Sequence, residues 1–214
     1  MQKSRMILMA DIIGSRSKDQ SVLMEDFKEV VTAVMKLNRD RFLSPITITL
    51  GDEFQCIVKS LLDSVIVIFE IEERIIRDQK KFKLRYVLLE GEIATPLNKK
   101  MAHGMMGSGL TQAREKLNHS KKSLGSRFSI ETIDSNTASN LNLAFMVYQS
   151  FVDDWSPEKD YTVVARFLDT DDYKLVADQL KRNRSLIWKR EHNLKIKQYK
   201  ATKTLIGRLV EGAL

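Results

Sequence analysis

The stretch that decides the fold is Thr49-Leu50-Gly51-Asp52-Glu53-Phe54-Gln55. It is a polar segment between two apolar ones, Ile46-Thr47-Ile48 and Cys56-Ile57-Val58, and this pattern is typical of a β-hairpin. Gly51 permits a tight turn that a Cβ atom would hinder. The hairpin therefore presents the Asp52 carboxylate at the end of a sheet, where it can bind a hard cation.

A second acidic segment lies upstream, where the apolar strand Met6-Ile7-Leu8-Met9-Ala10 ends at Asp11-Ile12-Ile13-Gly14-Ser15. Two strand-end carboxylates, Asp11 and Asp52, indicate one metal site if the two segments converge, and Mg²⁺ uses one or two carboxylates in this way. Glu53 is a weaker candidate, because side chains alternate along a strand and Glu53 follows Asp52 directly. The alternative is that both aspartates only accept hydrogen bonds from neighbouring backbone amides.

The chain has 214 residues, enough for one medium domain plus a small one. Its 43% hydrophobic and 29% charged residues are typical of a globular protein. The single cysteine, Cys56, excludes a disulfide framework and favours a reducing compartment. Because no apolar run approaches the length of a membrane span, we expect a cytoplasmic protein.

The order of the expected elements indicates the fold class. A helix with Phe27, Val30, Val31 and Val34 on its apolar face follows the first strand, and a second helix over 61–77 follows the hairpin. A strand at 83–89, a helix beginning near Thr111 and a strand at about 127–133 come next. This βαββαβ order with additions predicts an α+β, ferredoxin-like palm domain over residues 1–134.

The remaining chain reads as helical. Residues 135–155 predict a connecting helix, for which Asp134, Ser135 and Asn136 are candidate caps. Ser156-Pro157 predicts the start of three short helices in a small all-α domain over 156–214. The second and third, at 171–180 and 184–194, have the spacing of a helix-turn-helix, with these residues at its packing positions: Val176, Ala177, Leu180 and Ile187.

The formal net charge of +7 is concentrated in this last domain. Residues 181–203 contain nine cations and one acid, Glu191, so nine minus one gives +8 and the rest of the chain carries −1. A local basic patch is typical of a surface that binds polyanions, although a solvated helix face is the alternative. The nine cations are Lys181, Arg182, Arg184, Lys189, Arg190, Lys195, Lys197, Lys200 and Lys203.

The order "strand, Asp-Ile-x-Gly, helix, strand, Gly-Asp, strand" resembles the palm domain of class III nucleotide cyclases. Gly-Asp-Glu-Phe also resembles the motif of the GGDEF cyclases, with Leu50 in place of the first glycine. Taken with its C-terminal half, the whole chain is similar to the SatD family of bacterial proteins. The cyclase resemblance implies that Mg²⁺ or Mn²⁺ is bound by Asp11, the Ile12 carbonyl and Asp52. It also implies a catalytic Arg114 and nucleotide contacts from Gly14, Ser15, Gly51 and Gly107.

The positions that select the nucleotide in cyclases do not match. The expected lysine, acid and asparagine are Ile48, Gly107 and Leu110 here, and an apolar side chain cannot hydrogen-bond a base edge. We therefore expect a degenerate cyclase-like domain. The basic segment resembles the helix-turn-helix of sigma factors and response regulators, but it has Lys181 for the glycine of the turn and Arg182 for the apolar residue after it.

Three functions follow from these patterns. The first is an intracellular bacterial DNA-binding regulator of the SatD type, whose degenerate cyclase-like domain senses a nucleotide or a metal. The second is an active, metal-dependent nucleotide cyclase, whose sites would form between the two subunits of a homodimer. The third is a scaffold that binds RNA or an acidic protein. In the first, DNA contacts come from Lys181, Arg182, Arg184, Ser185, Trp188, Lys189, Lys195, Lys197 and Lys200.

Overall fold

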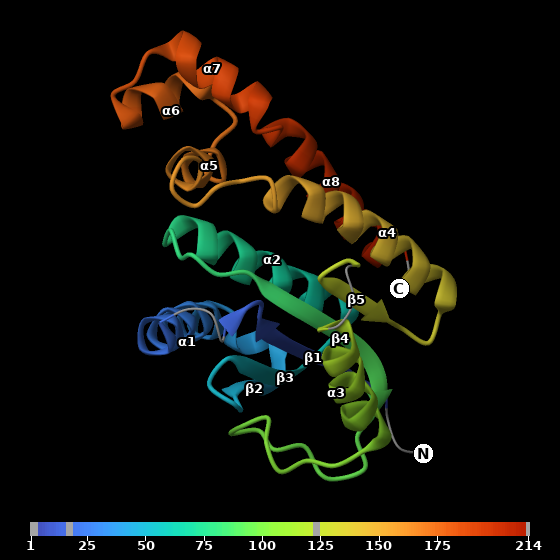
Figure 1. Cartoon of the computed structure of the whole chain (residues 1–214). Helices are drawn as coiled ribbons and strands as arrows, with labels where there is room; N and C mark the ends of the chain where they lie inside the picture. Colours follow the sequence, from blue (N-terminus) through green and yellow to red (C-terminus); the bar gives the residue numbers. More distant parts are fainter. Residues whose placement is uncertain (1–3, 16–18, 122–124, 213–214) are drawn as a thin grey trace.

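The computed structural model describes residues 4–15, 19–121 and 125–212, and it contains one five-stranded sheet in the order β2-β3-β1-β4-β5 (Figure 1). β1 is antiparallel to both of its neighbours, β2 and β3 form the hairpin, and β5 runs parallel to β4. The antiparallel order β2-β3-β1-β4 is that of the split βαβ plan, so the α+β, ferredoxin-like expectation is confirmed. The strands are β1 Ser4–Ile12, β2 Phe42–Ile48, β3 Glu53–Val58, β4 Leu84–Glu92 and β5 Phe128–Glu131.

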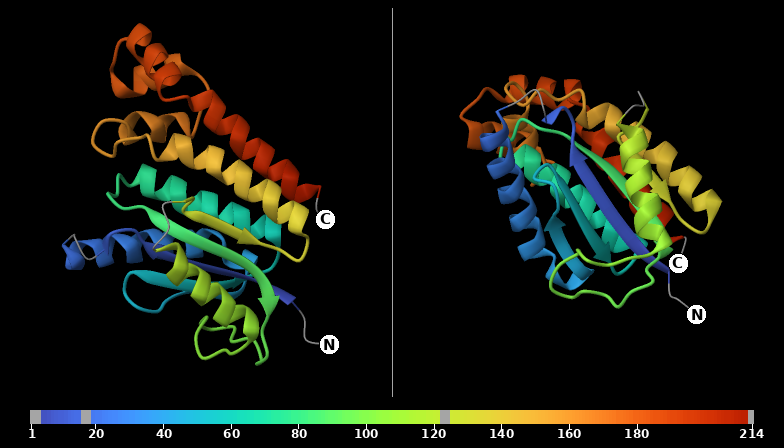
Figure 2. Two further views of the ribbon diagram at one scale, coloured as in Figure 1. Left: turned by 45° about the vertical axis from the view of Figure 1, so that its right-hand side comes forward. Right: turned by 60° about the horizontal axis from the view of Figure 1, so that its bottom comes forward.

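Helices cover the two faces of the sheet unequally (Figures 1 and 2). α1 (Gln20–Leu37) and α2 (Leu61–Arg77) lie side by side on one face, and α3 (Ser108–Ser120) lies on the other. Leu8 and Ala10 of β1 belong to the larger apolar cluster with α1 and α2, whereas Ile7 and Met9 pack against α3. The alternation of a strand therefore directs Asp11, two residues after Met9, to the face that α3 covers.

The described residues from Ser135 to Gly212 form five helices that lie beyond α2. The third helix expected in this region ends at Asn193, and a separate helix, α8, follows and packs along α4 and on α2. The helix start expected at Ser156-Pro157 is wrong, because these residues lie in a turn and α5 begins at Tyr161. The bounds are α4 Ser135–Val152, α5 Tyr161–Phe167, α6 Tyr173–Leu180, α7 Arg184–Asn193 and α8 Ile196–Glu211.

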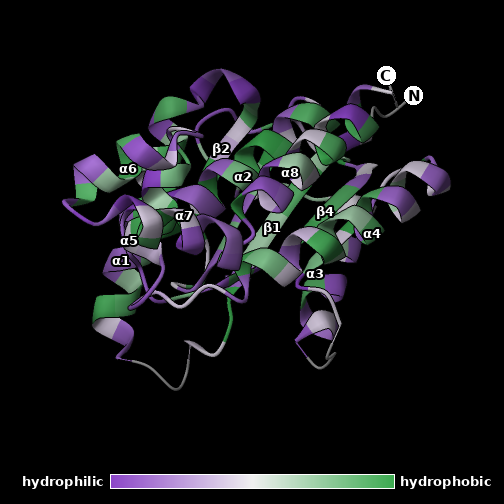
Figure 3. Ribbon diagram, turned by 90° about the horizontal axis from the view of Figure 1, so that it is seen from above, coloured by the Kyte–Doolittle hydropathy of each residue, from purple (hydrophilic) through white to green (hydrophobic). Residues whose placement is uncertain are grey.

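The C-terminal helices share a core with the sheet domain. Their buried apolar residues belong to the same cluster as those of α1, α2 and the sheet, and green apolar segments of α8 and α2 lie together in Figure 3. The ring of Tyr148 in α4 lies 5.2 Å from Phe69 in α2 and 5.5 Å from Tyr199 in α8. The indole N–H of Trp155 donates to the carbonyl of Leu194 (3.0 Å). Among the described residues, no helix is long and apolar enough to cross a membrane.

Candidate functional site

The two acidic segments meet at one end of the sheet. The backbone N–H of Ile12 donates to the carbonyl of Asp52 (2.9 Å), and the Ser15 hydroxyl donates to an Asp52 carboxylate oxygen (2.6 Å). A cavity of about 600 Å³ opens there. It is lined by Asp11, Ile12, Gly14, Ser15, Asp52, Arg85, Asn118 and Lys121.

Asp11 is held by cations from two other elements. In the strand register it lies directly opposite Arg85 of β4, whose Nη1 lies 3.1 Å from each of its carboxylate oxygens. The Nζ of Lys121, just after α3, lies 3.3 Å from Oδ2 of Asp11. Asp11 is 3% exposed, so this carboxylate has exchanged its water for two cationic partners.

Glu53 lies beside Asp11 on the face of the sheet that α3 covers, whereas its place directly after Asp52 predicted the opposite face. It pairs with Asp11 across β1 and β3, so both side chains point to the α3 face. Its carboxylate accepts from Arg114 of α3 and from Thr49 Oγ1 (3.0 Å), and Lys121 Nζ lies 4.0 Å away. Asp52 lies in the turn before β3, so the alternation of side chains along a strand does not relate its direction to that of Glu53. The missing information was the register between β1 and β3, which local patterns do not contain.

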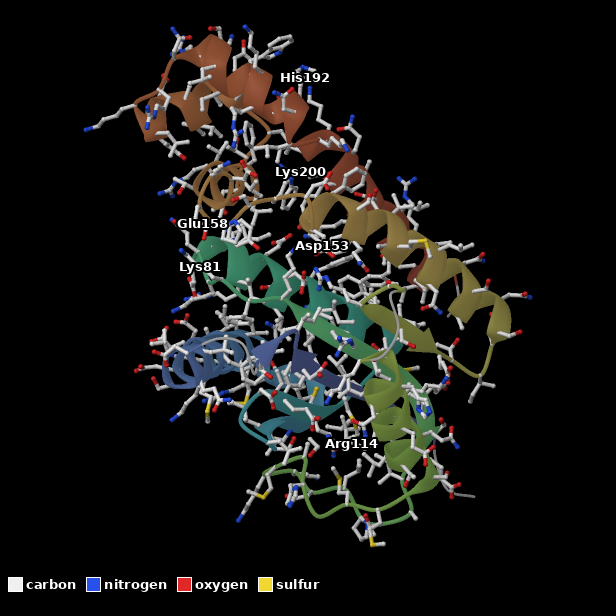
Figure 4. The ribbon with its side chains drawn as sticks, in the orientation of Figure 1. Lys81, Arg114, Asp153, Glu158, His192 and Lys200 are labelled. Carbon is white, nitrogen blue, oxygen red and sulfur yellow. The ribbon has the colours of Figure 1, made fainter. Side chains whose placement is uncertain are left out.

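One face of α3 brings three polar side chains to this end of the sheet. Arg114, Asn118 and Lys121 are spaced four and three residues apart, which places them on one side of a helix. Figure 4 shows Arg114 on α3, beside the sheet. Arg114 therefore lies next to the site, where it pairs with Glu53, and its side chain is about one-third exposed.

Burial shifts the pKa of Asp11 and that of Arg114. Desolvation raises the pKa of Asp11 above its usual value although Arg85 and Lys121 oppose it, and the charge of Asp52 raises this pKa further. Desolvation also lowers the pKa of Arg114, against the attraction of Asp11. The site thus combines two buried carboxylates with cations that are partly exposed at the cavity.

The fit to a divalent cation is poor. The expected ligands Asp11, Ile12 and Asp52 do line one cavity, but Arg85 and Lys121 already occupy the Asp11 carboxylate. Within the described part of the chain, no group of three or more His, Cys, Asp and Glu side chains is arranged to hold a metal. The residues present do not form a ready-made Mg²⁺ or Mn²⁺ site.

The four residues expected to touch a nucleotide lie in different places. Gly14 and Ser15 line the cavity, and Gly51 adopts the expected turn beside Asp52, with φ of 81°. Gly107 caps the other end of α3, about 20 Å from Lys121 at 1.5 Å per residue. A Cβ atom at Gly107 would lie 2.5 Å from the Glu92 carbonyl oxygen. The geometry thus gives this glycine a packing role against the end of β4, away from the cavity.

α6 and α7 are joined by the three-residue turn 181–183. Val176, Ala177 and Ile187 are buried between the helices and Leu180 is partly buried, as their spacing predicts. Lys181 has φ of 51°, the left-handed conformation for which a glycine was expected. Ser185, Trp188 and Lys189 are exposed on α7, and the Trp188 ring packs edge-on against His192 (4.4 Å between ring centroids).

Much of the positive charge of the basic segment, residues 181–203, is compensated by carboxylates in the folded protein. Six of its nine cations form ion pairs with carboxylates, five of which come from outside residues 181–203. The side chains of Lys181, Arg182 and Lys189 pair with no carboxylate of the described residues. The pairs are Arg184–Asp178, Arg190–Asp160, Lys195–Asp154, Lys197–Glu191, Lys200–Asp171 and Lys203–Glu73.

A model described as the SatD family matches residues 5–210. The structure is similar to that of a bacterial light-regulated adenylyl cyclase, at 13% identity and a TM-score of 0.46, with 61% of this chain and 76% of the other covered. A guanylyl cyclase is similar at 15% identity and a TM-score of 0.39, with 56% and 71% covered. A regulator of polyketide synthase expression from Bifidobacterium adolescentis aligns with 98% of this chain and 82% of its own, at 13% identity and a TM-score of 0.30. Among curated proteins, no sequence matches.

Proposed function

The chain belongs to the SatD family, and we propose that it is a regulator that contacts DNA through α6 and α7 and binds a nucleotide-like ligand beside Asp11 and Asp52. The observation that carries the DNA part is the exposed cationic surface of the turn and α7. On it, Lys181, Arg182 and Lys189 have no carboxylate partner among the described residues. Such unpaired cations are available for phosphate contacts.

The arrangement of α6 and α7 supports a helix-turn-helix reading. Ala177 is fully buried where the helices cross, and Asn183 caps α7 by accepting from the Ser185 N–H (2.8 Å). In such motifs the N-terminal residues of the second helix reach base edges. Arg184, Ser185 and Trp188 are the candidates for this role, and Arg184 would first have to leave Asp178.

Other cations of the segment can join when DNA is present. Lys195 and Lys200 pair with Asp154 and Asp171, whose side chains are 71% and 80% exposed, and exposed pairs of this kind contribute only about 0–1 kcal/mol. The carboxylate that pairs with Lys197, Glu191, is only 4% exposed. A DNA phosphate can therefore replace Asp171 or Asp154 at little cost. The unpaired cations set the minimum number of contacts at about three.

The test is fluorescence anisotropy with labelled duplex DNA over a range of salt concentrations. About three phosphate contacts give a slope near −3 for log affinity against log salt. The variant Lys181→Ala/Arg182→Ala/Lys189→Ala should lose most of the affinity. The control Lys36→Ala/Lys99→Ala/Lys100→Ala removes three exposed cations elsewhere and should retain it. Absence of binding to duplex DNA at low salt, or equal loss in both variants, would contradict the proposal, and preferential binding of an RNA competitor would favour the scaffold reading.

The ligand part is supported by the cavity itself. Its wall combines the Asn118 amide with the cations Arg85 and Lys121, which are donors suited to phosphoryl and ribose oxygens. The Ser15 hydroxyl, which donates to Asp52, can accept a hydrogen bond from a ribose hydroxyl. Thermal unfolding with mono-, cyclic and triphosphate nucleotides tests it. A rise in Tm with one of them, lost in Asn118→Leu, is expected. If no nucleotide changes the Tm, the proposal that a nucleotide-like ligand binds in this cavity is contradicted.

An active cyclase is the second candidate, since Asp11, Asp52 and Arg114 do lie at one end of the sheet. Against it, Arg85 and Lys121 occupy the Asp11 carboxylate. Incubation with Mn²⁺ and each nucleoside triphosphate, followed by product analysis, tests this candidate. A cyclic product from the wild type that is absent with Asp52→Ala would establish it, and a homodimer in light scattering would then be expected.

A further inference from the structure

Two buried carboxylates share one lysine at the end of the sheet. Asp11 and Glu53 are 3% and 2% exposed and lie opposite each other in β1 and β3. The Nζ of Lys121 lies 3.3 Å from Oδ2 of Asp11 and 4.0 Å from Oε2 of Glu53. A compact positive charge thus sits between two acids on neighbouring strands.

This is the position that a divalent cation would take to be shared by the two acids. The ammonium of lysine offers three donors around one point charge, so it can replace an ion without further rearrangement. Arg85 and Arg114 add positive charge from the other side of each acid. The neighbouring acids Asp11, Glu53 and Asp52 contribute −3 and the three cations +3, so an arriving divalent ion would meet no net negative charge.

We infer that the ammonium group of Lys121 is the resident cation of this site and that it excludes divalent ions from Asp11 and Glu53. On this proposal the Mg²⁺ or Mn²⁺ site expected from the sequence loses its Asp11 ligand to the lysine that follows α3. A corollary rests on the proposed function: the nucleotide-like ligand binds in the absence of any divalent cation.

The chain offers a matched control for the lysine. The side chain of Lys116, five residues earlier on α3, is 40% exposed against 41% for Lys121, and it pairs with Glu131 of β5, outside the cavity. Removing either lysine subtracts one positive charge, at α3 for Lys116 and directly after it for Lys121. Only the loss of Lys121 empties the position between Asp11 and Glu53.

The experiment is a Mn²⁺ titration of the full chain, with free Mn²⁺ read by electron paramagnetic resonance. The wild type and Lys116→Met should bind Mn²⁺ weakly and alike. Lys121→Met should bind at least about tenfold more tightly, because a unit positive charge about 4 Å from a divalent ion no longer repels it. Adding Asp11→Asn to Lys121→Met should abolish the gain.

Equal Mn²⁺ affinity of the wild type and Lys121→Met would overturn the inference, and so would tight wild-type binding that Asp11→Asn removes. Circular dichroism checks the fold, and Lys121→Gln serves if Lys121→Met does not fold. Nucleotide thermal shifts with EDTA separate the two proposals. A shift that persists in EDTA supports the inference, and one that requires Mn²⁺ overturns it but keeps the ligand proposal. If no nucleotide gives a shift, the ligand proposal fails and the Mn²⁺ titration alone decides the inference.

Discussion

The side-chain amide of Asn142 in α4 satisfies the backbone of Ile130 at the edge of the sheet. Its Oδ1 accepts from the Ile130 N–H (3.0 Å), and its Nδ2 donates to the Ile130 carbonyl (2.7 Å). Gln149 of the same helix accepts from the Arg127 N–H (2.8 Å). β5 is an edge strand, and open edges invite pairing with another chain. Asn142 therefore forms hydrogen bonds with β5 that a sixth strand would otherwise form, and Gln149 does the same directly before the strand.

Asn142→Ala should lower the free energy of unfolding by about 1–3 kcal/mol, because both backbone groups of Ile130 lose their partner. The exposed edge should also increase aggregation at high protein concentration. Urea unfolding and light scattering measure the two effects. Asn140→Ala, an exposed change on the same helix, should stay within about 0.5 kcal/mol of the wild type. Equal stability of the two variants would show that the amide is not needed.

Gly109 allows α3 to approach β4 closely. A Cβ atom at this position would lie 2.7 Å from the Gly91 carbonyl carbon and 2.8 Å from the Glu92 nitrogen, and both are backbone atoms. Gly109→Ala should therefore cost about 1–3 kcal/mol of unfolding free energy, the usual range for overpacking. Gly207→Ala in α8 meets nothing within 4 Å and should instead add about 0.5–1 kcal/mol. Urea unfolding of both variants checks the opposite signs.

Lys181 holds a left-handed conformation that costs a residue with a Cβ about 1–2 kcal/mol. Lys181→Gly should therefore increase the free energy of unfolding by about 0.5–1 kcal/mol and also weaken DNA binding through the lost charge. Lys174→Gly, at an exposed position within α6, should reduce stability by about 1 kcal/mol. Thermal unfolding and anisotropy together measure both effects. A Lys181→Gly variant with lower stability would contradict the argument.

Arg127, directly before β5, forms a buried ion pair with Glu72 of α2. Arg127 also donates to Asp153 (3.1 Å) and to the Leu84 carbonyl (2.9 Å), and both paired side chains are at most 6% exposed. Arg127→Met should lower the free energy of unfolding by about 3–5 kcal/mol, because it strands the Glu72 charge. The double variant Glu72→Leu/Arg127→Met should cost less than the sum of its single changes in a double-mutant cycle. Additive costs would show that the pair is not coupled.

Much of the fold could be predicted because its signals are local. The apolar periodicity of 61–77 predicted α2 despite its β-branched residues, and Asp134 caps α4 as its position suggested. The exchange of a glycine for Lys181 did not prevent the expected turn conformation. The helix, its cap and the turn conformation each depend on residues that are close in the sequence.

The rest depends on partners that are distant in sequence. Predicting the position of Glu53 beside Asp11 would require the register of β1 against β3. Predicting the position of Lys121 would require knowing that α3 ends next to these two strands. The basic segment looked uncompensated because the carboxylates that pair with Lys203 and Lys200 lie 130 and 29 positions away. Figure 4 shows a similar surface pair, Lys81 with Glu158 (3.0 Å), from segments far apart in the chain.

The protonation of Asp11 should make stability depend on pH in an unusual direction. Its pKa in the folded protein is raised above 3.8, chiefly because burial outweighs the attraction of Arg85 and Lys121. The folded state then binds more protons than the unfolded state between 3.8 and the raised pKa, so stability falls as the pH rises through that window. The variant Asp11→Asn tests this pH dependence of stability, since an amide cannot ionise.

The stability of the wild type relative to Asp11→Asn should therefore fall between pH 3.8 and the raised pKa and stay constant above it. Urea unfolding at closely spaced pH values measures this difference. Asp134→Asn should give the opposite slope, because hydrogen bonds from Thr137 and Asn136 lower the pKa of Asp134, so its contribution is lost as the pH falls below 3.8. If the Asp11 difference also rose with pH, the ion pairs with Arg85 and Lys121 would outweigh burial, and Lys121 would hold Asp11 more tightly than the raised pKa implies.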